Sequence, residues 1–65
     1  MIKIKVENLG RDKLNFIAEV KDMQEAYEEV DQHLYSFNTH ISKVEDKLYY
    51  VFAGFRKVGT IKIIN

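Results

Sequence analysis

The chain has 65 residues, which leaves room for one domain, and we expect residues 1–65 to form it. Hydrophobic residues make up 46% of the sequence, enough for a small core, and the absence of cysteine excludes disulfides and Cys-based zinc sites. Ten basic and ten acidic residues cancel, so the chain lacks the overall positive charge that drives most non-specific nucleic-acid binding.

Hydropathy and the N-terminal pattern indicate a cytoplasmic protein. No apolar run in the sequence approaches the roughly 18 residues that a membrane-spanning helix needs. Residues 2–6 alternate between apolar and basic side chains, unlike the continuous apolar core of a signal peptide. The lack of cysteine also suits a reducing compartment.

The first twenty residues predict a β-hairpin. Residues 2–7 alternate between β-branched and polar side chains, the pattern of a strand with one face in water. Residues 8–12 carry turn chemistry, and Gly10 among them is free to take a positive φ angle. Residues 14–21 alternate again, with Ile17 among the side chains of the second, mostly polar face.

Residues 23–37 predict an amphipathic helix. Its apolar stripe recurs at helical spacing and comprises Met23, Ala26, Tyr27, Val30, Leu34 and Phe37. Asp22 is a suitable N-cap, and Glu25 follows three residues later, as in a capping box. Asn38 suits the left-handed conformation in which many helices end. We expect the stripe to pack against a sheet.

The acidic residues gather in this helix. Residues 22–38 contain five acidic side chains and no lysine or arginine, a local charge of −5 that leaves +5 for the rest of a neutral chain. We therefore expect a bipolar molecule.

The C-terminal third returns to strand patterns. Residues 41–44 predict a short strand, residues 45–47 a turn, residues 48–53 a nearly continuous apolar strand, and residues 60–64 its hairpin partner. The fold class that follows is α+β: a single antiparallel sheet of four or five strands, in the order ββαββ(β), packed on one amphipathic helix.

A single helix can cover one face of such a sheet, but the last hairpin has apolar side chains for both faces. A register with a two-residue turn at residues 56–57 gives the outer face Tyr49, Val51, Phe55, Val58 and Ile64. A register with a longer loop and a bulge at Gly59 turns Val51 inward and gives the outer face Leu48, Tyr50, Phe52 and Ile64. Either register leaves an aromatic and aliphatic patch opposite the helix.

The candidate binding residues on that outer face are Ile17, Tyr49, Val51, Phe55, Lys62 and Ile64. An exposed apolar patch on a small protein usually marks an interaction surface. We therefore predict a non-enzymatic protein-interaction module, with a symmetric homodimer first and another protein partner second. The alternative is that the sheet curls enough to bury part of both faces, as a small barrel does.

The sequence predicts no catalytic residue, no metal site and no small-molecule cofactor. Ser36 and Ser42 stand outside the Gly-x-Ser-x-Gly motif of activated serines. His33, expected on the helix four residues after Glu29, and His40, expected in the loop after it, lack a ligand or base motif and are expected to be surface or half-buried side chains. A compact nuclease-like enzyme relying on His40 is the enzymatic alternative.

The main alternative function is a small nucleic-acid-binding protein that uses the same sheet face. Lys3, Lys5 and Lys62 are expected beside its aromatic side chains, as in single-strand binders that combine phosphate contacts with base stacking. The neutral net charge and the lack of an RNP-type motif favour protein binding instead. In length and in its lysine, asparagine and isoleucine content, the chain resembles small accessory proteins of phages and mobile elements.

Overall fold

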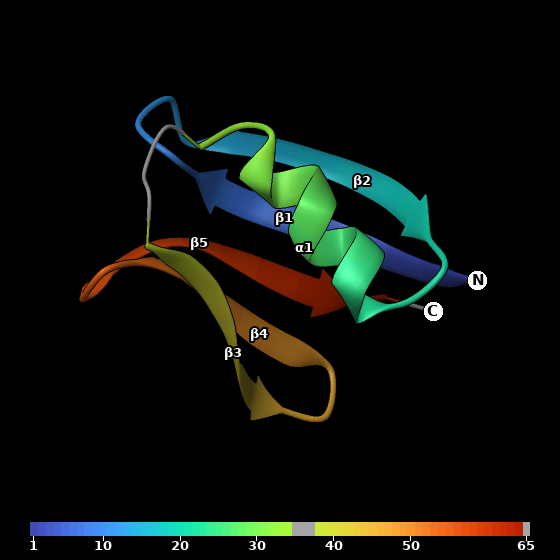
Figure 1. Cartoon of the computed structure of the whole chain (residues 1–65). Helices are drawn as coiled ribbons and strands as arrows, with labels where there is room; N and C mark the ends of the chain where they lie inside the picture. The colour runs from blue at the N-terminus through green and yellow to red at the C-terminus, as the bar shows by residue number, and fades with distance from the viewer. Residues whose placement is uncertain (35–37, 65) are drawn as a thin grey trace.

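The computed structural model describes residues 1–34 and 38–64. Its elements are the strands β1 (Ile2–Leu9) and β2 (Leu14–Val20), the helix α1 (Met23–Asp31), and the strands β3 (Thr39–Glu45), β4 (Leu48–Ala53) and β5 (Arg56–Ile63). The strands form one antiparallel sheet in the spatial order β2-β1-β5-β4-β3, and α1 lies across one face of it (Figure 1). The predicted α+β class, with a single antiparallel sheet and one helix, is confirmed.

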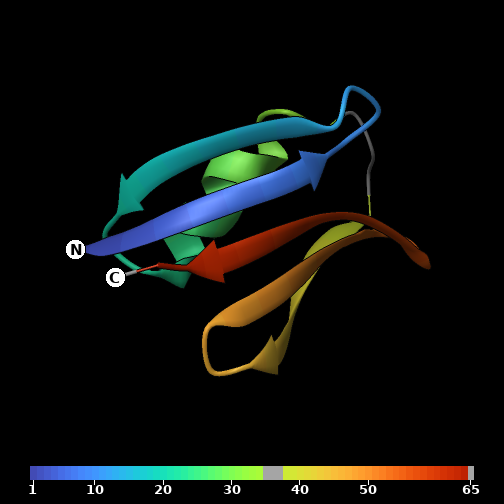
Figure 2. The ribbon, with the colours of Figure 1, turned by 180° about the vertical axis from the view of Figure 1, so that it is seen from behind.

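The opposite face of the sheet is seen from behind in Figure 2, where α1 lies beyond the strands. We call the face that α1 covers the inner face and the other the outer face. Strands β2 and β3 are the two edges, so the described strands form an open sheet that does not close into a barrel. No helix within the described part of the chain combines the length and apolar character that crossing a bilayer requires.

The first hairpin follows the alternating sequence and then changes phase. Ile4 and Val6 are buried, and the next buried residue, Leu9, comes three positions later because a bulge interrupts the pairing with β2. Asn8 takes a φ of 54° at this bulge, a left-handed conformation that asparagine tolerates better than most residues. Gly10 takes the predicted positive φ, 72°, in the turn that follows.

Helix α1 begins where the capping pattern predicts and ends earlier than expected. The Asp22 side chain accepts a hydrogen bond from the Glu25 N–H at 2.9 Å, and the Glu25 carboxylate accepts one from the Lys21 N–H at 3.2 Å. The helix ends at Asp31 instead of residue 37, because the His33 and Leu34 N–H groups donate to carbonyls three residues back in a tighter turn. Phe37 lies outside the described residues.

The residues predicted to end the helix and to form the loop after it lie instead at the start of the next strand. Asn38 directly precedes β3, and its carbonyl accepts a hydrogen bond from the Gly54 N–H at 2.9 Å, so it is not the helix cap. His40 lies within β3, not in a loop. Along α1 itself the predicted stripe packs as expected: Val30 is buried, and Tyr27 is half-buried against the core.

In the C-terminal hairpin the side chains of β4 face as in the second of the two predicted registers, but the longer loop and the bulge at Gly59 predicted with it are wrong. A two-residue turn at Gly54 and Phe55 joins β4 to β5, and Gly54 takes a φ of 65° at the first central position, where type II′ turns favour glycine. Strand β5 therefore begins at Arg56, well before the predicted residue 60. A bulge at Val58 then sets the pairing of Val51 with Gly59. The alternative turn at residues 56–57 is wrong.

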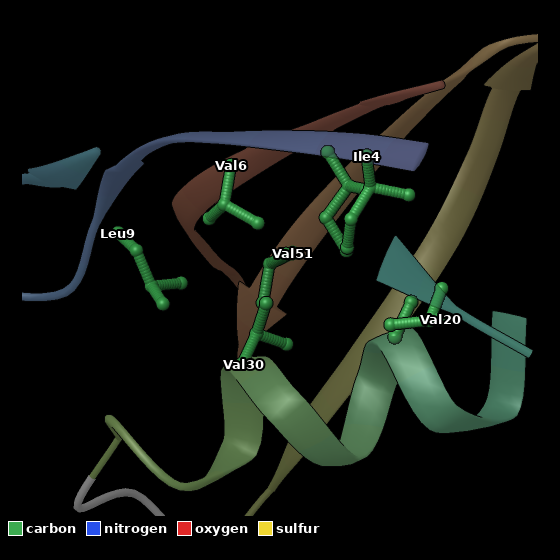
Figure 3. Close-up of a cluster of buried hydrophobic side chains, with 8 residues drawn as sticks. Ile4, Val6, Leu9, Val20, Val30 and Val51 are labelled. Carbon is green, nitrogen blue, oxygen red and sulfur yellow. The ribbon is translucent and has the colours of Figure 1, made fainter. Parts of the chain in front are cut away.

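The core lies between α1 and the inner face and is entirely hydrophobic. Its fully buried members come from the helix and from four strands (Figure 3): Ile4, Val6, Leu9, Val20, Ala26, Val30, Val51 and Ile61. Gly59 allows β5 to approach β1, since a Cβ there would lie 2.8 Å from the Leu9 Cδ1. Burial of this apolar surface, at about 25 cal/mol per Å², is the main source of stability.

Candidate functional site

The register of the sheet decides which side chains reach the outer face. Directly opposed residues of neighbouring strands share a face. Lys5 alternates with the buried Ile4 and Val6 and is opposite both Ile17 and Lys62, so all three project outward. The same pairing extends across β4 and β3, and it places on the outer face Leu48, Tyr50, Phe52, His40 and Lys57.

Three rings form an aromatic row across β3 and β4, which we define as His40, Phe52 and Tyr50. The His40 and Phe52 ring centroids lie 5.4 Å apart with the planes 16° from parallel, and Tyr50 meets Phe52 edge-on at 6.4 Å. The Lys57 Nζ lies 4.0 Å from the centroid of the Tyr50 ring, within cation–π range. The row presents π surface and one cation on the side of the sheet away from α1.

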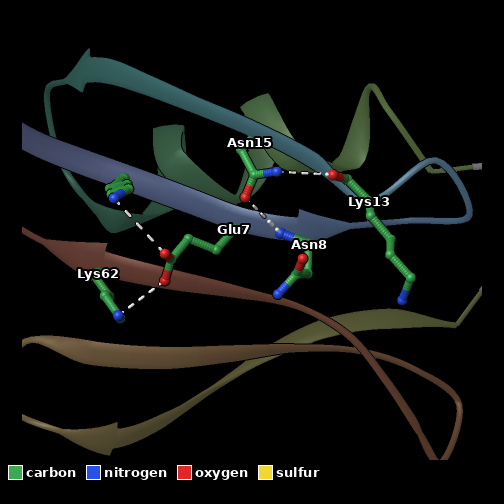
Figure 4. Close-up of polar contacts among 6 residues, drawn as sticks. Glu7, Asn8, Lys13, Asn15 and Lys62 are labelled. Carbon is green, nitrogen blue, oxygen red and sulfur yellow. Dashed lines mark hydrogen bonds and ion pairs between the residues drawn. The ribbon is translucent and has the colours of Figure 1, made fainter.

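The centre of the outer face is charged. The Glu7 carboxylate contacts the Lys62 Nζ at 2.9 Å and the Lys5 Nζ at 3.8 Å, so one acid lies between two cations (Figure 4). The hydrogen bond from Lys62 is the largest cause that holds the pKa of Glu7 below its ordinary value of 4.5; burial acts in the opposite direction, and attraction to both lysines adds to the lowering. Charged groups therefore separate the aromatic row from Ile17 at the β2 edge.

Four of the six predicted site residues are exposed. Ile17, with 56% of its surface exposed, and Lys62 lie on the outer face. Ile64 is 43% exposed just beyond β5, and its N–H donates to the Lys3 carbonyl at 2.9 Å. Phe55 is fully exposed at the tip of the β4–β5 turn, beyond the face itself.

The other two predicted site residues lie on the inner face, which corrects the prediction. Val51 is fully buried opposite Gly59, and Tyr49 lies opposite Ile61 and packs against the core. The cause is the register: the turn at Gly54 and the bulge at Val58 turn the odd-numbered residues of β4 inward.

The aromatic row was predicted only in part. Tyr50 and Phe52 are outer-face residues of the second predicted register. His40 and Lys57 are not among the predicted site residues, because their contacts with these rings depend on the exact pairing of β4 with β3 and β5, which the sequence pattern does not determine. Gly54 was the available signal, since glycine beside an aromatic residue between two apolar strands favours a type II′ turn.

The two histidines contact aromatic rings. His33 lies in the turn after α1, not on the helix surface as predicted, and its ring packs on Phe16 at 5.3 Å; His40 stacks on Phe52. Within residues 1–34 and 38–64, no group of three or more histidine and acidic side chains is placed to hold a metal ion. Ser36 lies outside the described residues.

Comparisons of the chain with protein-family models, with curated proteins and with solved structures find no match. The functional interpretation therefore depends on the geometry and chemistry of the surfaces.

Proposed function

We propose that the chain is a non-enzymatic binding module that contacts a protein partner, in the first instance a second copy of itself, through the outer face of the sheet. The observation that supports this proposal is the apolar set Leu48, Tyr50 and Phe52 on the face away from α1. Isolated apolar side chains are common on protein surfaces, but these three half-buried side chains come from one face of one strand, and Phe52 contacts both Tyr50 and the stacked His40.

The chemistry of the patch suits an interface. Aromatic side chains dominate binding energy at protein interfaces, and apolar burial contributes about 25 cal/mol per Å². A two-fold dimer brings the same patch of each copy together, so the aromatic rows of two copies can pack on one another. The charged centre formed by Lys5, Glu7 and Lys62 then lies beside this apolar contact, as the polar rim of an interface does.

Salt gives this association a recognisable signature. The strand pairing gives the outer face a net charge of +1, from four lysines (Lys3, Lys5, Lys57 and Lys62) and three glutamates (Glu7, Glu19 and Glu45). Two such faces repel each other weakly, and salt screens that repulsion. We expect outer-face association to strengthen as the ionic strength rises.

The substitution Tyr50→Glu tests the proposal. A carboxylate at this position would have to lose its hydration on association, so the variant should be a folded monomer where the wild type forms a dimer. Mass is measured by light scattering over a range of protein concentrations and salt, and folding is measured by circular dichroism.

Two matched variants make the result specific. Leu14→Glu makes a similar apolar-to-acid change at an exposed residue opposite Leu9, on the inner side of the sheet, and should leave the dimer intact. Tyr49→Glu places the same charge one residue earlier, against the core, and should unfold the chain. A wild type that stays monomeric at all concentrations, or a Tyr50→Glu protein that still dimerises, would contradict self-association through the outer face.

A further inference from the structure

A basic cleft opens at one end of the sheet. The β1–β2 turn and the β4–β5 turn lie at the same end in both views of the ribbon (Figures 1 and 2). Between these two turns and the side of the chain that carries His33 and Leu34 is a cleft of about 950 Å³. Its basic lining comes from both turns: Arg11, Lys13, Arg56 and Lys57.

The charge of this cleft is one-sided. Among the described residues that line it, Asp12 is the single acidic one, against four cations. On the outer face, by contrast, Lys5 and Lys62 are already paired with Glu7. The acidic side chains of α1 lie outside the cleft lining. The bipolar charge predicted from the sequence therefore has its concentrated positive part at the two turns.

Hydrogen bonds from a side chain and from the backbone hold the β1–β2 turn in place. The Asn15 side chain accepts a hydrogen bond from the Asn8 N–H at 3.2 Å and donates one to the Lys13 carbonyl at 3.0 Å (Figure 4). The Gly10 N–H donates to the Val58 carbonyl at 2.8 Å, which ties this turn to β5. The cations of the two turns are thus carried on backbone segments that are bonded to each other.

The shape and exposure of the cleft favour a polymer over a single small anion. All four cations are exposed, and a lone ion held by exposed side chains gains little in water. A polyanion can contact several of them at once and releases bound counterions when it does so. Arginine guanidinium groups match phosphate oxygens in a two-pronged geometry, and the cleft contains two arginines.

We propose that this basic cleft binds the phosphate backbone of a nucleic acid. Apolar side chains between the cations, Leu14 and Val58 among them, give sugars and bases a surface to contact. The site is separate from the outer-face contact proposed above, and Lys57 is the residue shared by the two surfaces, since it lines the cleft and lies over Tyr50.

Fluorescence anisotropy with labelled oligonucleotides tests this proposal. The probes are a single strand of about 16 nucleotides and a duplex of the same length. If four phosphates are contacted, affinity for the single strand should fall about 50-fold between about 50 mM and about 200 mM salt. This dependence is opposite in sign to the one expected for outer-face association, so the two proposals are distinguished by salt alone.

A pair of double variants assigns the binding to the cleft. Arg11→Glu with Arg56→Glu should lower affinity at least about tenfold and flatten the salt dependence, because two contacts become repulsive. Lys21→Glu with Lys43→Glu makes the same change in net charge at exposed lysines outside the cleft lining and should stay within about twofold of wild type.

Light scattering and circular dichroism are measured on each variant. If a variant keeps the mass and the fold of the wild type, its loss of nucleic-acid binding can be attributed to the cleft. The failure of the dimer proposal would leave this result standing. The assignment would be overturned if neither the single strand nor the duplex binds at low salt, or if both double variants lose the same amount of affinity.

Discussion

The two faces of the sheet bury their apolar side chains in different ways. On the inner face, Ile4, Val6 and Ile61 are completely shielded beneath α1, in a cluster that contains no charged group. On the outer face, Tyr50 and Phe52 are half-buried by one another and by neighbouring charged side chains. Apolar composition alone therefore does not distinguish core from surface in this chain; the presence of a covering element does.

The largest expected contrast between the faces is in a pair of isoleucine truncations. Ile61→Ala removes methyl groups from a fully buried site on a central strand and should lower the free energy of unfolding by about 2–5 kcal/mol. Ile17→Ala alters an outer-face side chain that is 56% exposed and should change stability by about 0.5 kcal/mol or less. Urea unfolding of both variants measures the difference. Equal losses would mean that the outer face is also core.

A smaller effect is expected where β5 approaches β1. Gly59→Ala would place a Cβ 2.8 Å from the Leu9 Cδ1 and 3.3 Å from the Leu9 Cα, so one strand must shift, at a cost of about 1–3 kcal/mol.

A double-mutant cycle with Leu9→Ala isolates this contact. Removing the Leu9 side chain makes room for the new methyl group, so the two substitutions together should cost less than the sum of each alone. If the losses of stability measured in thermal melts simply add, the contact with Leu9 is not the reason that a side chain at residue 59 is destabilising.

The smallest expected effect belongs to the outer face and depends on pH. The lowered pKa of Glu7 means that its ionised form stabilises the folded state above the ordinary pKa of 4.5, and this stabilisation is lost as the pH falls through the folded-state pKa. Because the cluster is near the surface, the effect should be small and should shrink further with salt. Melting temperatures across this acid range, compared with those of Glu7→Gln, should show a shallower acid-side loss in the variant.

In the N-terminal half, the sequence pattern predicts the positions of the secondary-structure elements well, because alternation and capping residues are both clear there. Alternation predicts the start of β2 at Leu14 and its end to within one residue, and Asp22 with Glu25 predicts the start of α1. The end of α1 was not predictable from spacing, since Leu34 keeps helical phase with Val30 although the helix has already ended, and it still packs against the core from the following turn.

The C-terminal half was harder because residues 48–53 lack alternation. With apolar side chains on both faces of β4, the sequence pattern admits two registers, and only the turn and the bulge choose between them. Gly54 could have favoured the correct turn. The bulge at Val58 lies where β5 meets Leu9 of β1 and Gly10 of the following turn, a contact between distant parts of the chain that local sequence does not contain.

The pairing of β1 with β5 at the centre of the sheet also bears on how the chain folds. These strands are the first and last along the described sequence, yet they are neighbours, with Lys5 opposite Lys62. The β1–β2 and β4–β5 hairpins close short loops, whereas the central pair has to join segments separated by nearly the whole chain and must overcome the larger entropy of closing that loop. During synthesis, Ile4 and Val6 therefore stay without their β5 partners until the last strand has been made.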